Sequence, residues 1–88
     1  MSASAKKVAE EFKKMVREKL GIVPAHVEAM CDNAPEVVAN FVRMYGAAMK
    51  PGALDSKVKE LMGLAVAVAL GCKHCMVWHT IMALEHGA

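Results

Sequence analysis

Apolar residues recur at intervals of three and four positions near the beginning of the chain, and most positions between them are charged. This spacing predicts an amphipathic helix over residues 4 to 20, because one helical turn takes about 3.6 residues. Ser2 or Ser4 could cap its start, and Gly21 could end it. The apolar stripe consists of Val8, Phe12, Met15, Val16 and Leu20.

Prolines divide the next part of the chain into two further helices. Pro24 suits the first turn of a short helix that continues to about Cys31. Pro35 opens a third helix that continues to about Met49, and Pro51-Gly52 interrupts the pattern after it. The third helix has a broad apolar face that is made of Val37, Val38, Phe41, Val42, Met44 and Tyr45.

The most apolar stretch of the chain follows Glu60 and ends before Gly71. Asp55 or Ser56 caps a fourth helix that runs to Leu70. This helix carries no charged residue after Glu60, so we expect it to be buried on nearly all sides.

Val66 and Val68 alternate with alanines, as residues in a strand would, but the length and alanine content of the run favour a helix. A fifth helix starts around Cys72 and runs to Glu85. The chain is therefore expected to be all-α, an orthogonal or bundle-like fold of about five helices with short loops. With 88 residues it is expected to form a single domain.

The composition adds an expectation about assembly. Hydrophobic residues make up 56% of the chain, with few aromatic residues and eight methionines. A chain of this size buries only about 60–65% of its unfolded surface. The excess apolar surface predicts a homo-oligomer, to which the first and third helices contribute exposed apolar faces.

The charge and the cysteine count exclude several classes of protein. The net charge of +2 is too small to indicate nucleic acid binding, and the apolar run from Leu61 to Cys72 is shorter than the roughly 20 residues of a membrane span. The start of the chain leads into a charged amphipathic segment and shows no signal peptide. Three cysteines argue against the disulfide framework of a secreted protein. We therefore expect a cytoplasmic protein that binds neither nucleic acid nor membrane.

Reactive side chains gather between Glu60 and His79. Cys72 and Cys75 fall in the first turn of the fifth helix, where unpaired N–H groups and the helix dipole stabilise a thiolate. His79 follows Cys75 by four residues and lies on the same helix face, where it can take the thiol proton. This proximity favours Cys75 as the attacking thiol and Cys72 as the resolving thiol. Position at the very start of the helix favours the opposite order.

Glu60 lies in the apolar fourth helix, and a carboxylate buried there needs a partner. If the fourth and fifth helices form an antiparallel hairpin about Gly71, Glu60 and His79 lie toward the same end. At about 1.5 Å per residue, their depths differ by roughly one turn, so a skewed crossing or a bridging water would be needed to connect them. Glu60 could then orient His79 and stabilise its charged form.

The pattern Glu60-x11-Cys72-x2-Cys75-x3-His79, with His74 between the thiols, resembles a known motif. It is the core motif of the AhpD-like alkylhydroperoxidases, which belong to the carboxymuconolactone decarboxylase family. The resemblance includes Ala34-Pro35-Glu36, Tyr45-Gly46 and the stretch from Met49 to Asp55. It is strongest over residues 34 to 88 of the single domain expected over residues 1 to 88.

The family resemblance implies an AhpD-like helical fold, trimers or hexamers, and an antioxidant enzyme that is a thiol-dependent peroxidase or disulfide oxidoreductase. No bound cofactor and no metal are implied. Reducing equivalents would come from an external dithiol such as the lipoyl group of a partner protein, and a peroxiredoxin is a second implied partner. Cys72 and Cys75 would form a redox-active disulfide, and the catalytic residues would be Glu60, Cys72, His74, Cys75 and His79.

Other interpretations of the same residues stay open. A zinc site could use both thiols of the CxxC pair, His79 and Glu60 as its four ligands. A decarboxylase-like enzyme and a structural oligomer with an idle dithiol are two further alternatives, although the decarboxylase branch of the family typically lacks the CxxC pair. His26 and Cys31 are interpreted as structural residues, and no role is assigned to His86.

Two other classes of CxxC protein are excluded. A c-type haem site needs a histidine directly after the second cysteine, and Met76 occupies that position. A thioredoxin fold needs strands, and the predicted elements contain none.

Overall fold

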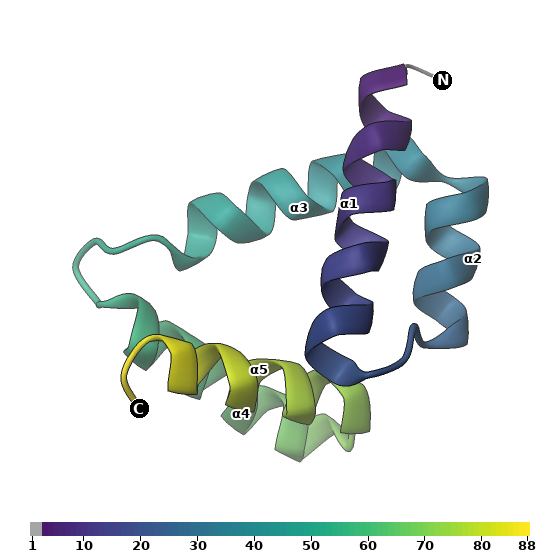
Figure 1. Ribbon diagram of the computed structural model, residues 1–88. Coiled ribbons are helices and arrows are strands. Elements are labelled where there is room, and N and C mark those ends of the chain that lie inside the picture. Colours follow the sequence, from purple (N-terminus) through teal and green to yellow (C-terminus); the bar gives the residue numbers. More distant parts are fainter. Residues whose placement is uncertain (1–2) are drawn as a thin grey trace. The chain divides into compact units, whose positions relative to one another are not determined.

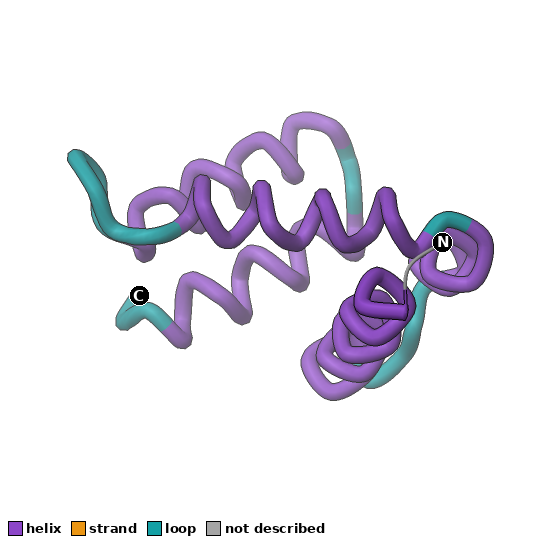
Figure 2. Tube along the Cα trace, turned by 90° about the horizontal axis from the view of Figure 1, so that it is seen from above, coloured by secondary structure: helices purple, strands orange, loops and turns teal. Residues whose placement is uncertain are grey.

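The computed structural model describes residues 3–88, and within them it contains five α-helices and no strand (Figure 2). The all-α prediction is therefore confirmed, and Val66 and Val68 lie in a helix, not in a strand. The helices are α1 (Ala3–Leu20), α2 (Ala25–Asn33), α3 (Pro35–Met49), α4 (Ser56–Leu70) and α5 (Lys73–Glu85), labelled in Figure 1.

Proline, glycine and aspartate set most of the helix ends, as the sequence predicts. Pro24 is the N-cap of α2, and Pro35 is the first residue of α3. Asp55 caps α4, because its Oδ1 accepts a hydrogen bond of 2.8 Å from the Val58 amide. Ser4 lies inside α1, so its prediction as a cap is wrong, and the alternative cap Ser2 lies outside the described residues.

The chain separates into two compact units that divide after Ala47. In the first unit, α1 packs against α2 (Figure 1). The Lys13 Nζ donates a hydrogen bond of 2.8 Å to Asp32 Oδ1 and joins the two helices at their surface. The core consists of the buried residues Ala9, Cys31 and Val38, surrounded by Phe12, Val27 and Val42.

Cys31 is buried in this core, with an exposed fraction of 4%. Its surroundings are apolar, and burial raises the pKa of its thiol. The interpretation of Cys31 as a packing residue fits this position. His26 lies on the exposed surface of α2.

In the second unit, α4 and α5 pack against each other as a helical hairpin (Figure 1). The buried residues of α4 follow one another at intervals of four and seven positions, so they form a single stripe along the helix. These residues are Ser56, Glu60 and Ala67, and Ala83 is the buried residue of α5. Glycine and alanine at this contact allow the two backbones to approach closely.

The opposite side of α4 is exposed, which corrects the prediction that this helix is buried on nearly all sides. One neighbouring helix covers only one face of α4, and that leaves large apolar side chains uncovered in the single chain. Their exposed fractions are 43% for Leu61, 55% for Met62, 58% for Val66, 58% for Val68 and 77% for Leu70.

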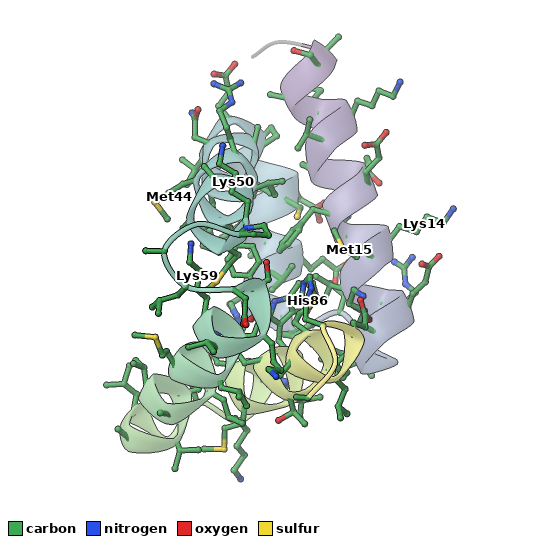
Figure 3. All side chains as sticks on the ribbon, turned by 90° about the vertical axis from the view of Figure 1, so that its left-hand side faces the viewer. Lys14, Met15, Met44, Lys50, Lys59 and His86 are labelled. Atoms are coloured by element: carbon green, nitrogen blue, oxygen red, sulfur yellow. A yellow bond between two sulfur atoms is a disulfide. The ribbon has the colours of Figure 1, made fainter. Side chains whose placement is uncertain are left out.

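The predicted contribution of α1 and α3 to exposed apolar surface is correct only for α3. Val37, Phe41 and Met44 of α3 are exposed, and Met44 projects from this helix in Figure 3. Among the described residues of α1, Met15 is the large apolar residue with the most exposed side chain, at 36%. The charged face of α1 therefore remains its main outer surface.

The connection between α3 and α4 is held by side chains at the beginning of α4. Ser56 Oγ donates to the Met49 carbonyl at 2.7 Å. Lys59 Nζ, labelled in Figure 3, donates to the carbonyls of Ala48 and Lys50 at 2.9 and 2.8 Å. These bonds satisfy carbonyl groups that lose their partners where α3 ends. The two bonds also fix the side chain of Lys59, which directly precedes Glu60.

Within the described residues, no helix combines the length and the apolar character that crossing a membrane requires.

Candidate functional site

A two-residue reversal joins α4 to α5 and brings the reactive residues into one unit. Gly71 adopts a left-handed conformation with φ of 70°, which side chains on other residues disfavour. The amides of Gly71 and Cys72 donate to the carbonyls of Val68 and Ala67 at 3.1 and 3.0 Å. Backbone hydrogen bonds thus cap the C-terminus of α4, and the chain continues directly to Cys72.

Cys72 and Cys75 form a disulfide at the start of α5, with their Cα atoms 5.2 Å apart. Cys72 is also the N-cap of α5, and its Sγ accepts a hydrogen bond of 3.4 Å from the Cys75 amide. Both residues are half-buried. The sulfur of Cys72 therefore occupies the position where a helix start stabilises negative charge.

Glu60 and His79 meet directly across the α4–α5 contact. His79 Nδ1 lies 2.8 Å from Glu60 Oε1, and the Glu60 side chain is 0% exposed against 17% for His79. The sequence suggested that these residues differ in depth by about a turn, but the packing of the two helices brings them into a direct hydrogen bond. No buried side-chain nitrogen or oxygen in the described part of the chain lacks a hydrogen-bond partner.

This bond selects a tautomer of the imidazole. When Glu60 is ionised it accepts hydrogen bonds only, and His79 then donates through Nδ1–H. Nε2 is then the basic nitrogen of the neutral ring, and a carboxylate on Nδ1 also stabilises the imidazolium after Nε2 takes a proton. Because Cys75 precedes His79 by one helical turn, its thiol lies on the face of α5 that carries this base.

The His79 ring lies directly against Gly63 of α4. A Cβ atom placed on Gly63 would be 2.7 Å from Cε1, 2.8 Å from Nδ1 and 3.1 Å from Nε2 of that ring. Gly63 follows Glu60 by three residues and so shares its face of the helix. The three-residue spacing from Glu60 is the sequence signal that Gly63 could face the same partner.

The structure thus brings together Glu60 with His79 and Cys72 with Cys75. His74, between the two cysteines, is exposed in the first turn of α5. The two sulfurs are bonded to each other, and no group of three or more histidine, cysteine, aspartate and glutamate side chains within residues 3–88 is arranged to hold a metal ion.

Comparison with known proteins identifies the family. The model of the carboxymuconolactone decarboxylase family matches residues 35–88, which include α3, α4, α5 and every residue of the site. The chain belongs to the carboxymuconolactone decarboxylase family. The AhpD-like resemblance of the motif is consistent with this membership.

A protein of Cupriavidus necator that is described as uncharacterised is 41% identical to this chain over 54 residues. The match covers 61% of this chain and 48% of the relative, so the chain spans about half the length of the curated relative that it matches. No solved structure matches the chain. Membership of the carboxymuconolactone decarboxylase family points to an enzyme, and its reaction has to be argued from the residues of the site.

Proposed function

We propose that this protein is a thiol-dependent peroxidase or disulfide oxidoreductase that uses Cys72 and Cys75 as its redox pair. The observation that supports this proposal is the disulfide at the start of α5, one turn before a histidine hydrogen-bonded to a buried carboxylate at 2.8 Å. A dithiol and a positioned base are the two components that peroxide reduction at neutral pH requires.

The proposed cycle begins with the reduced dithiol. His79 Nε2 takes the proton of Cys75, and the thiolate attacks the peroxide, which breaks the O–O bond and releases an alcohol after His79 returns the proton. Cys75 becomes a sulfenic acid. The Cys72 thiol gives up its proton and attacks that sulfur, so the S–S bond forms as the S–O bond breaks, and the leaving oxygen takes the proton and departs as water. An external dithiol, such as a lipoyl group on a partner protein, then reduces the disulfide and is itself oxidised.

Glu60 acts in this cycle through His79. Its carboxylate holds the Nδ1–H, so that Nε2 is the nitrogen that accepts the proton, and it stabilises the imidazolium while the proton resides there. His74 is exposed and lies between the two cysteines in the sequence, a position that fits a role in stabilising thiolate charge during reduction.

Removing the base tests the proposal. In the reduced protein, His79→Ala should slow peroxide-dependent thiol loss by about 10²–10⁴-fold, the usual contribution of a positioned general base. Glu60→Gln keeps the shape of the side chain and removes its charge, so its rate should lie between those of wild type and His79→Ala. Free thiols are counted in stopped samples after addition of limiting peroxide, and two thiols per chain should disappear together.

His86→Ala is the matched control, because it removes an exposed imidazole near the end of α5, outside the site. It should oxidise at the wild-type rate. Equal rates for wild type, His79→Ala and Glu60→Gln would contradict a role for the pair. Turnover of a carboxymuconolactone substrate with no thiol loss would instead favour the decarboxylase-like alternative.

A further inference from the structure

The His79 ring packs against α4 at Gly63. The position of a Cβ on this residue falls 2.7 to 3.1 Å from three atoms of the ring, well inside ordinary contact distance. Ordinary carbon–carbon contacts lie at about 3.5–4.0 Å. The ring therefore occupies space that any other residue at this position would fill.

The ring is held from two directions. Glu60 Oε1 fixes its Nδ1 at 2.8 Å, and the backbone at Gly63 sets how closely its plane approaches α4. A side chain at position 63 would push the ring outward by roughly 0.8 Å to restore ordinary contact. Hydrogen bonds weaken steeply when their length or angle departs from the preferred range, so this movement would disturb the bond to Glu60.

We propose that Gly63 is a positioning residue, whose missing side chain allows Glu60 to hold His79 in the tautomer and orientation that serve the dithiol. The expected effect of Gly63 on the rate of thiol oxidation rests on the proposed peroxidase or oxidoreductase function. Its effect on the position of the His79 ring does not depend on that function.

Gly63→Ala tests this inference, because alanine favours helix more than glycine does and should not by itself loosen α4. A displacement of about 1 Å in a catalytic group can lower a rate by about 10²-fold, so we expect thiol oxidation to fall by about 10–100-fold. Gly46→Ala in α3 is the matched control, since a Cβ there meets nothing within 4 Å. It should leave the rate unchanged within about twofold.

A double variant separates action through His79 from a general structural effect. In a His79→Ala background the ring is gone, so Gly63→Ala should slow oxidation no further, and the two changes should be strongly non-additive. Additive losses in the double variant would overturn the inference.

Nitrogen-15 NMR of the imidazole provides a readout that needs no catalysis. At a pH where the ring is neutral, wild type should show it protonated at Nδ1, with nuclear Overhauser contacts between Gly63 Hα and the His79 ring. Gly63→Ala should lose this tautomer signature, while Gly46→Ala keeps it. The absence of the ring contacts in wild type would overturn the inference even if Gly63→Ala failed to fold.

The two proposals fail separately. If wild type and His79→Ala oxidise at the same rate, the role of His79 in the proposed function fails, and NMR still decides whether Gly63 positions the ring. If wild type depends on His79 but Gly63→Ala retains both the rate and the tautomer signature, the Gly63 inference fails alone.

Discussion

Cys72 and Cys75 share the first turn of α5, but different groups act on their sulfurs. Cys72 caps the helix and accepts from the Cys75 amide, so its thiolate would be stabilised by backbone dipoles. Cys75 lies one turn before His79 and has access to a base held by Glu60. A small peroxide can reach a half-buried thiol, whereas a protein-bound dithiol needs a sulfur at the helix end.

We therefore predict that Cys75 forms the sulfenic acid. In Cys72→Ser, limiting peroxide followed by a dimedone-type probe should label Cys75, and mass spectrometry should locate the label. Cys31 is the internal control, because burial raises the pKa of its thiol and keeps it protonated and unlabelled. Label that appears in Cys75→Ser and is absent from Cys72→Ser would assign the attack to Cys72 and leave the dithiol mechanism intact.

Individual residues also show where the sequence was sufficient. The spacing of Glu60, Cys72, Cys75 and His79 predicted a shared site, because each interval has a direct meaning on a helix or a hairpin. The direct bond between Glu60 and His79 could not be predicted, because it depends on the crossing of α4 and α5. The contact of Gly63 with the ring depends on that same crossing.

Among the elements, helix ends were the most predictable feature. Prolines, Asp55 and Gly71 act through their own backbone or through a bond to the next turn, so no tertiary information is needed to place them. The exposure of α4 was not predictable in this way. A run of apolar residues predicts that a helix will be buried, but it does not show which of its faces are buried by the same chain.

The end of α3 provides a prediction about stability. Lys59 Nζ bonds to the carbonyls of Ala48 and Lys50 at 2.9 and 2.8 Å, and Lys59→Met keeps the methylene chain but removes both bonds. Because the freed carbonyl groups can form hydrogen bonds with water instead, we expect a loss of only about 1–2 kcal/mol in the free energy of unfolding. The melting temperature should fall by about 4–16 °C, followed by circular dichroism.

Lys57→Met is the control for this change, because it alters the same residue type in the same helical turn. It should alter stability by no more than about 0.5 kcal/mol. Equal effects of the two variants would show that charge or surface composition, and not the bonds to the carbonyls, accounts for the loss.

For the whole molecule, the exposed face of α4 bears on assembly. Apolar surface contributes about 25 cal/mol per Å² when it is removed from water, and the exposed side chains of α4 lie on one broad side of the helix. We propose that a further copy of the chain covers this face in a trimer or hexamer. The sequence predicted that α1 and α3 contribute exposed apolar faces, and the structure adds α4, whereas α1 presents mostly charged residues.

Sedimentation at micromolar concentration tests the assembly. Wild type should sediment as a trimer or hexamer, and Val66→Glu, which places a charge in the middle of the exposed face, should shift it to smaller species. Ala29→Glu makes the same change in charge at an exposed position of α2 and should leave the sedimentation coefficient unchanged. A monomeric wild-type protein would refute the predicted assembly.

The reversal at Gly71 and Cys72 has a consequence for the entropy of forming the site. The Glu60–His79 bond joins residues that are 19 positions apart, and the two cysteines are closer still. The entropic cost of closing a loop rises by about 0.6 kcal/mol with each doubling of its length. Partners separated by most of the chain would require about two more doublings, or roughly 1.2 kcal/mol. Enclosing the base and the dithiol in one hairpin avoids that cost, and it leaves the order of the site dependent on a single chain reversal.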